Sequence, residues 1–207
     1  MTVQAGGLGR EARVTTNGQL KRLVVAITGA SGVDIGYELL RQAREVQLTT
    51  HLVISAAGMR TIREESRHAP ADFRALASET HSNRDIGAAI ASGSFETAGM
   101  IIAPCSMKTL AEIAHGIAGS LIVRAADVTL KERRPLVLAV RETPLHLGHL
   151  RNMTLVTEMG AIVAPPVPAF YQHPRDIDDL LAQTAARLLQ MAGIPAPRLR
   201  GWPGESG

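Results

Sequence analysis

Aromatic residues are scarce in this chain: Phe, Trp and Tyr together make up 3% of its 207 residues. Few aromatic rings leave few flat surfaces on which nucleic acid bases could stack. The formal net charge is only +3, and no block of five like charges occurs. The composition therefore argues against a nucleic-acid-binding protein and favours a small anionic ligand.

Long apolar runs are also lacking. No stretch of about 18 apolar residues occurs, so we expect no membrane span. The Gly-rich, charged beginning of the chain lacks the apolar segment of a signal peptide. The one cysteine, Cys105, permits no internal disulfide, which fits a cytoplasmic protein. We expect a flexible N-terminal arm over residues 1–20, a single domain over 21–194 and a C-terminal tail over 195–207.

What the chain does contain is a series of apolar runs without alternation, typical of strands buried on both faces of a sheet. Segments with helical spacing separate these runs. Strands that alternate with helices in this way predict an α/β fold with a doubly wound, mainly parallel sheet and helices on both faces. The expected strands lie in 22–32, 50–55, 99–106, 135–140 and 161–168, and the expected helices are 33–45, 56–66, 106–116, 120–132, 145–160 and 176–193.

The carboxyl ends of parallel strands form the edge where such sheets bind ligands. Two of these ends are strand-to-helix junctions, "TGASG" (28–32) and "PCSMKT" (104–109), whose helix N-termini can bind an anion. A tight turn at the first and an ordinary helix cap at the second would explain each alone. The glycines 29, 32 and 36 also do not follow the GxGxxG spacing of dinucleotide sites. The two junctions together are more specific than either one.

The segment "VTLKERRPLVLAVRETPL" (128–145) places charges at both ends of one expected strand. Arg141 and Glu142 follow the strand and belong to the ligand edge. A second group precedes it, about 15–20 Å away at the rise of a strand. One subunit could not easily close both groups around one phosphate, whereas a neighbouring subunit could supply the second. A helix C-terminus, which favours cations, also explains that group. Its members are Lys131, Glu132, Arg133 and Arg134.

Several other residues have simple structural explanations. Cys105 could be a nucleophile, but a lone cysteine at a strand end is more often a small buried hydrophobe. His146 and His149 could hold a metal but lack an obvious third ligand. Arg187 would by default be a solvated helix residue, and Tyr171 a half-packed loop residue. No GxSxG motif of a serine hydrolase occurs.

Six segments occur in the family order of the flavin prenyltransferases of the UbiX family, which the chain resembles: "TGASG", "IGAAIASGSF", "PCSMKTLAEIA", "RAADVTLKERRPLVLAVRETPLHLGHLRNM", "GAIVAPPVPAFYQHP" and "DDLL". The resemblance covers residues 21–194, and the long central segment is very specific. It implies a Rossmann-like, flavoprotein fold and a homo-oligomer, typically a dodecamer. The implied reaction transfers a dimethylallyl group from dimethylallyl phosphate to N5 and C6 of reduced FMN, without a metal. The prenylated FMN would serve a UbiD-like decarboxylase.

The resemblance also implies roles for particular residues. Acid–base chemistry falls to Glu142, with Glu65 close by, and Ser31 lies where the family holds a hydroxyl near the flavin N5. Lys131, Tyr171 and Arg187 would bind the substrate phosphate, with Lys131 counted among the catalytic residues. FMN would be bound by Gly29, Ala30, Ser31, Ser55, Ser106, Met107, Lys108, Thr109 and Arg141.

One loop departs from the family pattern, which usually reads Gly-Ala-x-Tyr-Gly after the residue that matches Ser31. Here the segment is "GVDIG" (32–36), so Ile35 replaces the tyrosine and Asp34 adds a negative charge. The difference bears on the packing around the flavin and on substrate affinity.

Two alternatives of the same fold stay open. An FMN-dependent decarboxylase would carry a catalytic His after the second βα unit and a PxMNxxMW-like segment, and neither is evident. A non-catalytic flavin carrier would bind FMN and hand it on. Turnover of FMN with dimethylallyl phosphate distinguishes these possibilities.

Overall fold

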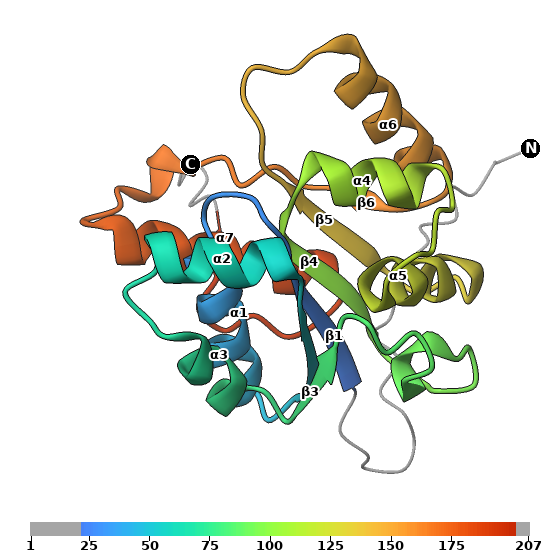
Figure 1. The fold of residues 1–207 in the computed structure, drawn as a ribbon. Coiled ribbons are helices and arrows are strands. Elements are labelled where there is room, and N and C mark those ends of the chain that lie inside the picture. The colour runs from blue at the N-terminus through green and yellow to red at the C-terminus, as the bar shows by residue number, and fades with distance from the viewer. Residues whose placement is uncertain (1–21, 202–207) are drawn as a thin grey trace, which may run out of the picture.

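The computed structural model describes residues 22–201, so the expected arm over 1–20 lies outside the described residues. Its centre is a six-stranded sheet in the order β3-β2-β1-β4-β5-β6, in which every neighbouring pair is parallel. Helices cover both faces (Figure 1). The expected α/β fold is confirmed. The strands are β1 (Arg22–Ile27), β2 (Thr49–Ile54), β3 (Glu79–Ser82), β4 (Gly99–Cys105), β5 (Leu136–Val140) and β6 (Ile162–Val163).

Two hydrophobic clusters fill the spaces between the sheet and its helices. Alternate residues of β1 enter different clusters, because successive side chains of a strand point to opposite faces. One cluster includes residues of α1 (Asp34–Glu45), α2 (Ala56–Glu65), α3 (Pro70–Leu76) and α7 (Ile177–Met191). The other includes residues of α4 (Met107–Ala114), α5 (Leu121–Lys131), α6 (Leu147–Glu158) and the 3₁₀ turn η1 (Ala89–Ala91). None of the helices between residues 22 and 201 is long and apolar enough to cross a membrane.

One short strand and one short helix were not predicted from the sequence. Strand β3 has the sequence ETHS, lies at an edge of the sheet and is mostly exposed, so it carries no apolar run. Helix α3 has seven residues, of which only Phe73 is buried. Both elements are short and lack a clear sequence pattern. Strand β3 is held by pairing with β2, and α3 by the packing of Phe73 in a hydrophobic cluster.

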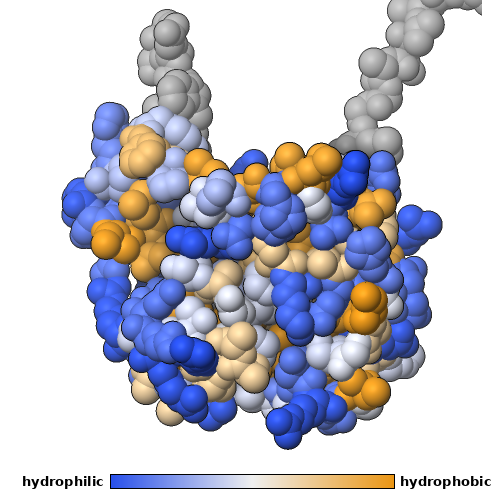
Figure 2. All heavy atoms as spheres, turned by 45° about the horizontal axis from the view of Figure 1, so that its top comes forward, coloured by the Kyte–Doolittle hydropathy of each residue, from blue (hydrophilic) through white to orange (hydrophobic). Residues whose placement is uncertain are grey.

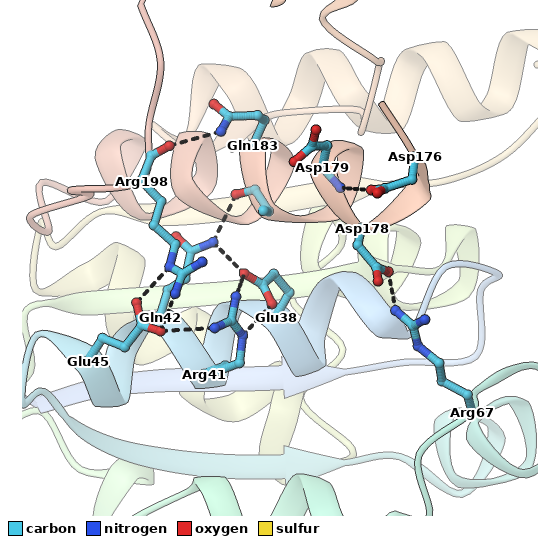
Figure 3. A network of polar contacts seen from close by, with 11 residues as sticks. Glu38, Arg41, Gln42, Glu45, Arg67, Asp176, Asp178, Asp179, Gln183 and Arg198 are labelled. Carbon is cyan, nitrogen blue, oxygen red and sulfur yellow. Dashed lines mark hydrogen bonds and ion pairs between the residues drawn. The ribbon is translucent and has the colours of Figure 1, made fainter. Parts of the chain in front are cut away.

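Helices α1 and α7 pack side by side, and polar contacts join them (Figure 3). The Gln42 side-chain amide donates to the carbonyl of Ala182 at 2.9 Å. Beyond α7, the Arg198 guanidinium donates two hydrogen bonds to Glu45, at 2.6 and 2.7 Å, and these bonds hold the pKa of Glu45 below its usual range. The segment that follows α7 therefore runs back along both helices as far as the structure describes it.

Helix α6 is sparsely covered for a helix of twelve residues. Val156 is its only buried residue. Large apolar side chains lie at the surface on and beside this helix, and Figure 2 shows apolar groups among the charged ones on this side of the molecule. Large exposed apolar side chains grouped on one element are a feature of protein–protein interfaces. The exposed residues are Leu145, Leu147, Leu150 and Met159.

Candidate active site

The carboxyl ends of β1, β4 and β5 are joined by hydrogen bonds at one edge of the sheet. Thr28, directly after β1, donates to the carbonyl of Pro104 from its backbone N–H (3.2 Å) and from its hydroxyl (2.9 Å). The same hydroxyl accepts the N–H of Ser106 at 2.8 Å. The N–H of Arg141 donates to the carbonyl of Cys105 at 3.1 Å. Thr28, which the sequence analysis gave no role, therefore fixes the two expected junctions against each other.

The first junction packs tightly against the start of α2. A Cβ at Gly29 would lie 2.3 Å from the Cβ of Ala57, so the loop can approach the helix only because residue 29 is glycine. Gly32 has a φ of +94°, which also favours glycine. Ser55 caps α2 by accepting the N–H of Gly58 at 2.9 Å. The small residues Gly29, Ala30 and Ser31 thus lie beside the N-terminus of α2.

The second junction opens α4. Ser106 caps the helix: its hydroxyl oxygen accepts the N–H of Thr109 at 3.3 Å and its hydroxyl lies 3.1 Å from the hydroxyl of Thr109. Met107 and Lys108 occupy the first turn, where backbone N–H groups have no partner within a helix and the helix dipole is positive. The Lys108 ammonium is exposed and lies 3.1 Å from Glu112. Ser106 is therefore an ordinary cap at a position that also suits an anion.

Two carboxylates flank this edge. Glu65, the last residue of α2, accepts the backbone N–H of Gly32 at 3.0 Å, which brings it to the loop that carries Ser31. Glu142 follows β5, is exposed, and accepts the N–H of Thr143 at 3.0 Å. Arg141 beside it is also exposed.

Tyr171 and Arg187 line one cavity of about 260 Å³. Tyr171 lies in the 3₁₀ turn η2 (Phe170–Gln172) and Arg187 on α7, so residues from separate elements meet here. The remaining wall is largely apolar and includes the two prolines after β6 and the segment beyond α7. Its members include Pro165, Pro166, Val167, Leu188, Met191 and Leu199.

Lys131 lies in a different part of the fold from this cavity. It is the last residue of α5, forms an ion pair with Glu132, and lines a separate hollow of about 700 Å³ with Arg133 and Met159. Arg134, by contrast, donates to the carbonyls of Phe95 and Gly93, both at 2.8 Å. Within one chain the structure does not bring Lys131 to the cavity that holds Tyr171 and Arg187.

Cys105 is a buried core residue, and His146 caps the start of α6. Cys105 is fully buried, and this burial raises the pKa of its thiol to about 12, so the thiol is not a nucleophile at neutral pH. His146 caps α6: its Nδ1 accepts the N–H of Gly148 at 3.0 Å and that of His149 at 3.4 Å.

The loop that departs from the family pattern is accommodated by local packing. Ile35 is buried in the hydrophobic cluster of α1 and α7. The Asp34 carboxylate accepts a hydrogen bond from the hydroxyl of Ser66, which follows α2. The additional charge is therefore partnered next to the first junction.

Comparison with known proteins agrees with this geometry. A family model described as Flavoprotein matches residues 11–188, so the fold is that of a flavoprotein. The flavin prenyltransferase UbiX of Escherichia coli (strain K12) is 54% identical over 179 residues, which cover 86% of this chain and 95% of that relative. The chain belongs to the UbiX family of flavin prenyltransferases, and it is an enzyme.

Two solved structures are similar over nearly the whole described chain. The crystal structure of AnUbiX (PadA1) in complex with FMN and dimethylallyl pyrophosphate has a TM-score of 0.88 and 47% identity, covering 90% of this chain and 99% of that one. A dodecameric FMN-dependent UbiX-like decarboxylase from Escherichia coli O157:H7 has a TM-score of 0.85 and 47% identity, covering 88% and 100%. Membership of the family favours a prenyltransferase over the decarboxylase and carrier alternatives.

Proposed function

We propose that the protein transfers a dimethylallyl group from dimethylallyl phosphate to N5 and C6 of reduced FMN. The observation that carries this proposal is the joining by Thr28 of the two strand-to-helix junctions at the ligand edge, in a chain 47% identical to a protein crystallised with FMN and dimethylallyl pyrophosphate. Tyr171 and Arg187 supply the cavity for the second substrate.

The residues at the two junctions fit a flavin mononucleotide. Small side chains at Gly29, Ala30 and Ser31 let an anion approach the backbone, and the N-termini of α2 and α4 favour negative charge. Ser55, Ser106 and Thr109 add hydroxyl groups, and Met107, Lys108 and Arg141 complete the proposed flavin site. Ser31 is the hydroxyl that we place near N5.

When bound, reduced FMN supplies the two nucleophilic atoms, N5 and C6. The protein must neutralise the phosphate as the allylic C–O bond breaks. Arg187 and the Tyr171 hydroxyl are donors suited to this, because hydrogen bonds to a charged phosphate are strong. The apolar wall at Pro165 and Pro166 would shield the allylic cation from water.

Glu142 is the proposed proton carrier. As the N5 bond replaces the C–O bond, it would carry the N5 proton to the departing phosphate. The second bond needs a proton added to the prenyl double bond and the C6 proton removed, and a carboxyl group within reach can carry both. Glu65 holds the Gly32 N–H and lies close enough to the loop to assist. No metal is needed in this scheme, since cationic side chains meet the phosphate.

Lys131 completes the phosphate site from a neighbouring subunit in this proposal. Its ion-pair partner Glu132 is a surface group, and such pairs exchange at little cost. The exposed apolar residues of α6 supply an interface, and one relative is a dodecamer. We infer a dodecamer that works in the cytoplasm, where the lone thiol stays reduced, and that passes prenylated FMN to a UbiD-like decarboxylase.

The test is to incubate the purified chain with FMN, dithionite and dimethylallyl phosphate under anaerobic conditions and weigh the flavin by mass spectrometry. We expect a flavin heavier by one prenyl group. Unchanged FMN, with binding confirmed by fluorescence quenching, would contradict the proposal. A Ser106→Trp variant, which fills the second junction, controls for flavin binding.

A further inference from the structure

Three potential metal ligands converge on strands β2 and β3. Strand β3 lies at the edge of the sheet (Figure 1). The register places His51 of β2 opposite Glu79 of β3. His81 is two residues beyond Glu79, so it lies on the same face of β3. Among the described residues, these three form the only group of His, Cys, Asp and Glu side chains close enough to hold one ion.

The separations of the three ligand atoms suit a tetrahedral ion. His51 Nδ1 lies 3.0 Å from His81 Nε2 and 3.4 Å from a Glu79 oxygen, and His81 Nε2 lies 3.6 Å from the other Glu79 oxygen. Ligands about 2.0–2.1 Å from a tetrahedral Zn²⁺ lie about 3.3–3.4 Å from one another. The two distances to Glu79 are longer than ordinary hydrogen bonds. The three distances of 3.0, 3.4 and 3.6 Å lie on either side of the separation expected between two ligands of one zinc ion.

Hydrogen bonding alone leaves the cluster incompletely satisfied. His51 Nε2 is buried and has no hydrogen-bond partner. If Nδ1 carries the ring proton, Nε2 is a buried acceptor without a donor. If Nε2 carries it, Nε2 is a buried donor without an acceptor, and the Nδ1 lone pair faces His81 and Glu79. A cation would select this second tautomer and use the lone pairs of Nδ1, of His81 and of Glu79 together, while Nε2 stays unpaired.

The burial of the three side chains suits a site that solvent reaches from one side. The side chains of His51 and His81 are buried, at 4% and 8% relative exposure. Glu79 is exposed and leaves a route from solvent and a fourth position for water.

We propose that His51, Glu79 and His81 bind one divalent transition-metal ion, with Zn²⁺ the best match to two imidazoles, one carboxylate and an open position. The ion would fasten the short edge strand β3 to β2. His51 is four residues before Ser55, about 13 Å along the strand from the proposed flavin edge. The site is therefore structural and separate from prenyl transfer.

The experiment uses the untagged full chain, treated with EDTA, desalted and titrated with ZnCl₂ in a calorimeter, with metal content measured by mass spectrometry. We expect one ion per chain and a higher melting temperature with Zn²⁺, since a ligand of the folded state stabilises it. His81→Ala should abolish this uptake. Glu79→Gln, at an exposed position where misfolding is not expected, should weaken it by at least about tenfold.

His149→Ala serves as the matched control, because it removes a histidine from the other close pair. It should keep the uptake and the thermal shift. No uptake by the wild-type chain, uptake that survives both His81→Ala and Glu79→Gln, or uptake lost in His149→Ala would overturn the proposal. In the first two outcomes the cluster is a hydrogen-bonded group only, and in the third the ion binds at α6.

Discussion

The charged groups at the two ends of β5 differ in whether they lie near the proposed flavin site of their own chain. At the carboxyl end, the backbone of Arg141 is bonded to Cys105, and Glu142 lies at the edge shared with both helix junctions. At the other end, Arg134 is bound to two backbone carbonyls, Lys131 pairs with Glu132, and no junction is near. One end is a site within the chain, and the other presents a lysine to the surface.

This difference indicates that charges which are neighbours in sequence have separate tasks. Arg134 fixes the loop at Gly93 and Phe95 to the end of α5. Lys131 has only a surface ion pair, which costs little to exchange. In the proposed site, the substrate phosphate bound to a neighbouring subunit would replace Glu132 as the partner of Lys131, because a phosphate carries more negative charge than a carboxylate and offers three acceptor oxygens.

The largest effect is expected at the carboxyl end of β5. Glu142→Gln should lower the rate of prenylation about 10²- to 10⁴-fold while FMN binding is unchanged, because the amide cannot carry the proton. Single-turnover kinetics and an FMN titration measure the two quantities. Glu158→Gln, an exposed carboxylate at the end of α6, is the control. Wild-type turnover in Glu142→Gln would remove this residue from the mechanism.

At the other end of β5, Lys131→Ala should raise KM for dimethylallyl phosphate about 10- to 100-fold, since a hydrogen bond to a charged group contributes about 1.5–3 kcal/mol. The melting temperature should stay within a degree or two, because the side chain is exposed. Arg133→Asn removes a neighbouring charge at a position with a φ of +57°, which Asn tolerates, and should leave KM unchanged. Equal effects of both variants would show that only the general charge of this surface matters.

Arg134→Met should have the opposite effects to Lys131→Ala, a loss of stability with an almost unchanged KM. Loss of the bonds to Gly93 and Phe95 should destabilise the protein by roughly 2 kcal/mol and lower Tm by about 4–8 °C, with little change in KM. Thermal unfolding and steady-state kinetics test this together. A KM change as large as that of Lys131→Ala, at unchanged Tm, would make Arg134 a substrate ligand instead.

The smallest effect concerns the ion pair of Lys131. The bond from Lys131 lowers the pKa of Glu132, so in Lys131→Ala this pKa should rise towards its ordinary value, as NMR titration of the carboxyl group would show. Glu132→Gln should change prenylation less than about fivefold, because exposed ion pairs contribute little. A large loss of activity in Glu132→Gln would mean that the pair itself is needed.

Much of the fold could be predicted from the sequence, because continuous apolar runs such as those of β1 and β4 mark buried strands. The two junctions could be located for the same reason, since each directly follows such a run. Strand β3 could not, because its four residues are mostly exposed and are held by pairing with β2.

Contacts between distant residues were the part that the sequence could not supply. Thr28 reaches Pro104 and Ser106 across 76 and 78 residues, and His51 meets His81 only through the register of β2 and β3. The two histidines that are close in sequence, His146 and His149, form a helix cap instead. The role that we propose for Lys131 needs a second copy of the chain, so it could not be derived from the contacts within one subunit.

The most direct test of a shared active site mixes two impaired proteins. Lys131→Ala and Glu142→Gln subunits are dissociated, mixed in equal amounts and reassembled, native mass spectrometry confirms hybrid oligomers, and activity is assayed at a dimethylallyl phosphate concentration well below the raised KM of Lys131→Ala. We expect the hybrids to exceed the summed activity of the two parent proteins, because some sites combine an intact Glu142 with an intact Lys131 from a neighbour. Confirmed hybrids with no activity above that sum would contradict the shared site and place both residues in the site of one subunit, or Lys131 outside the site altogether.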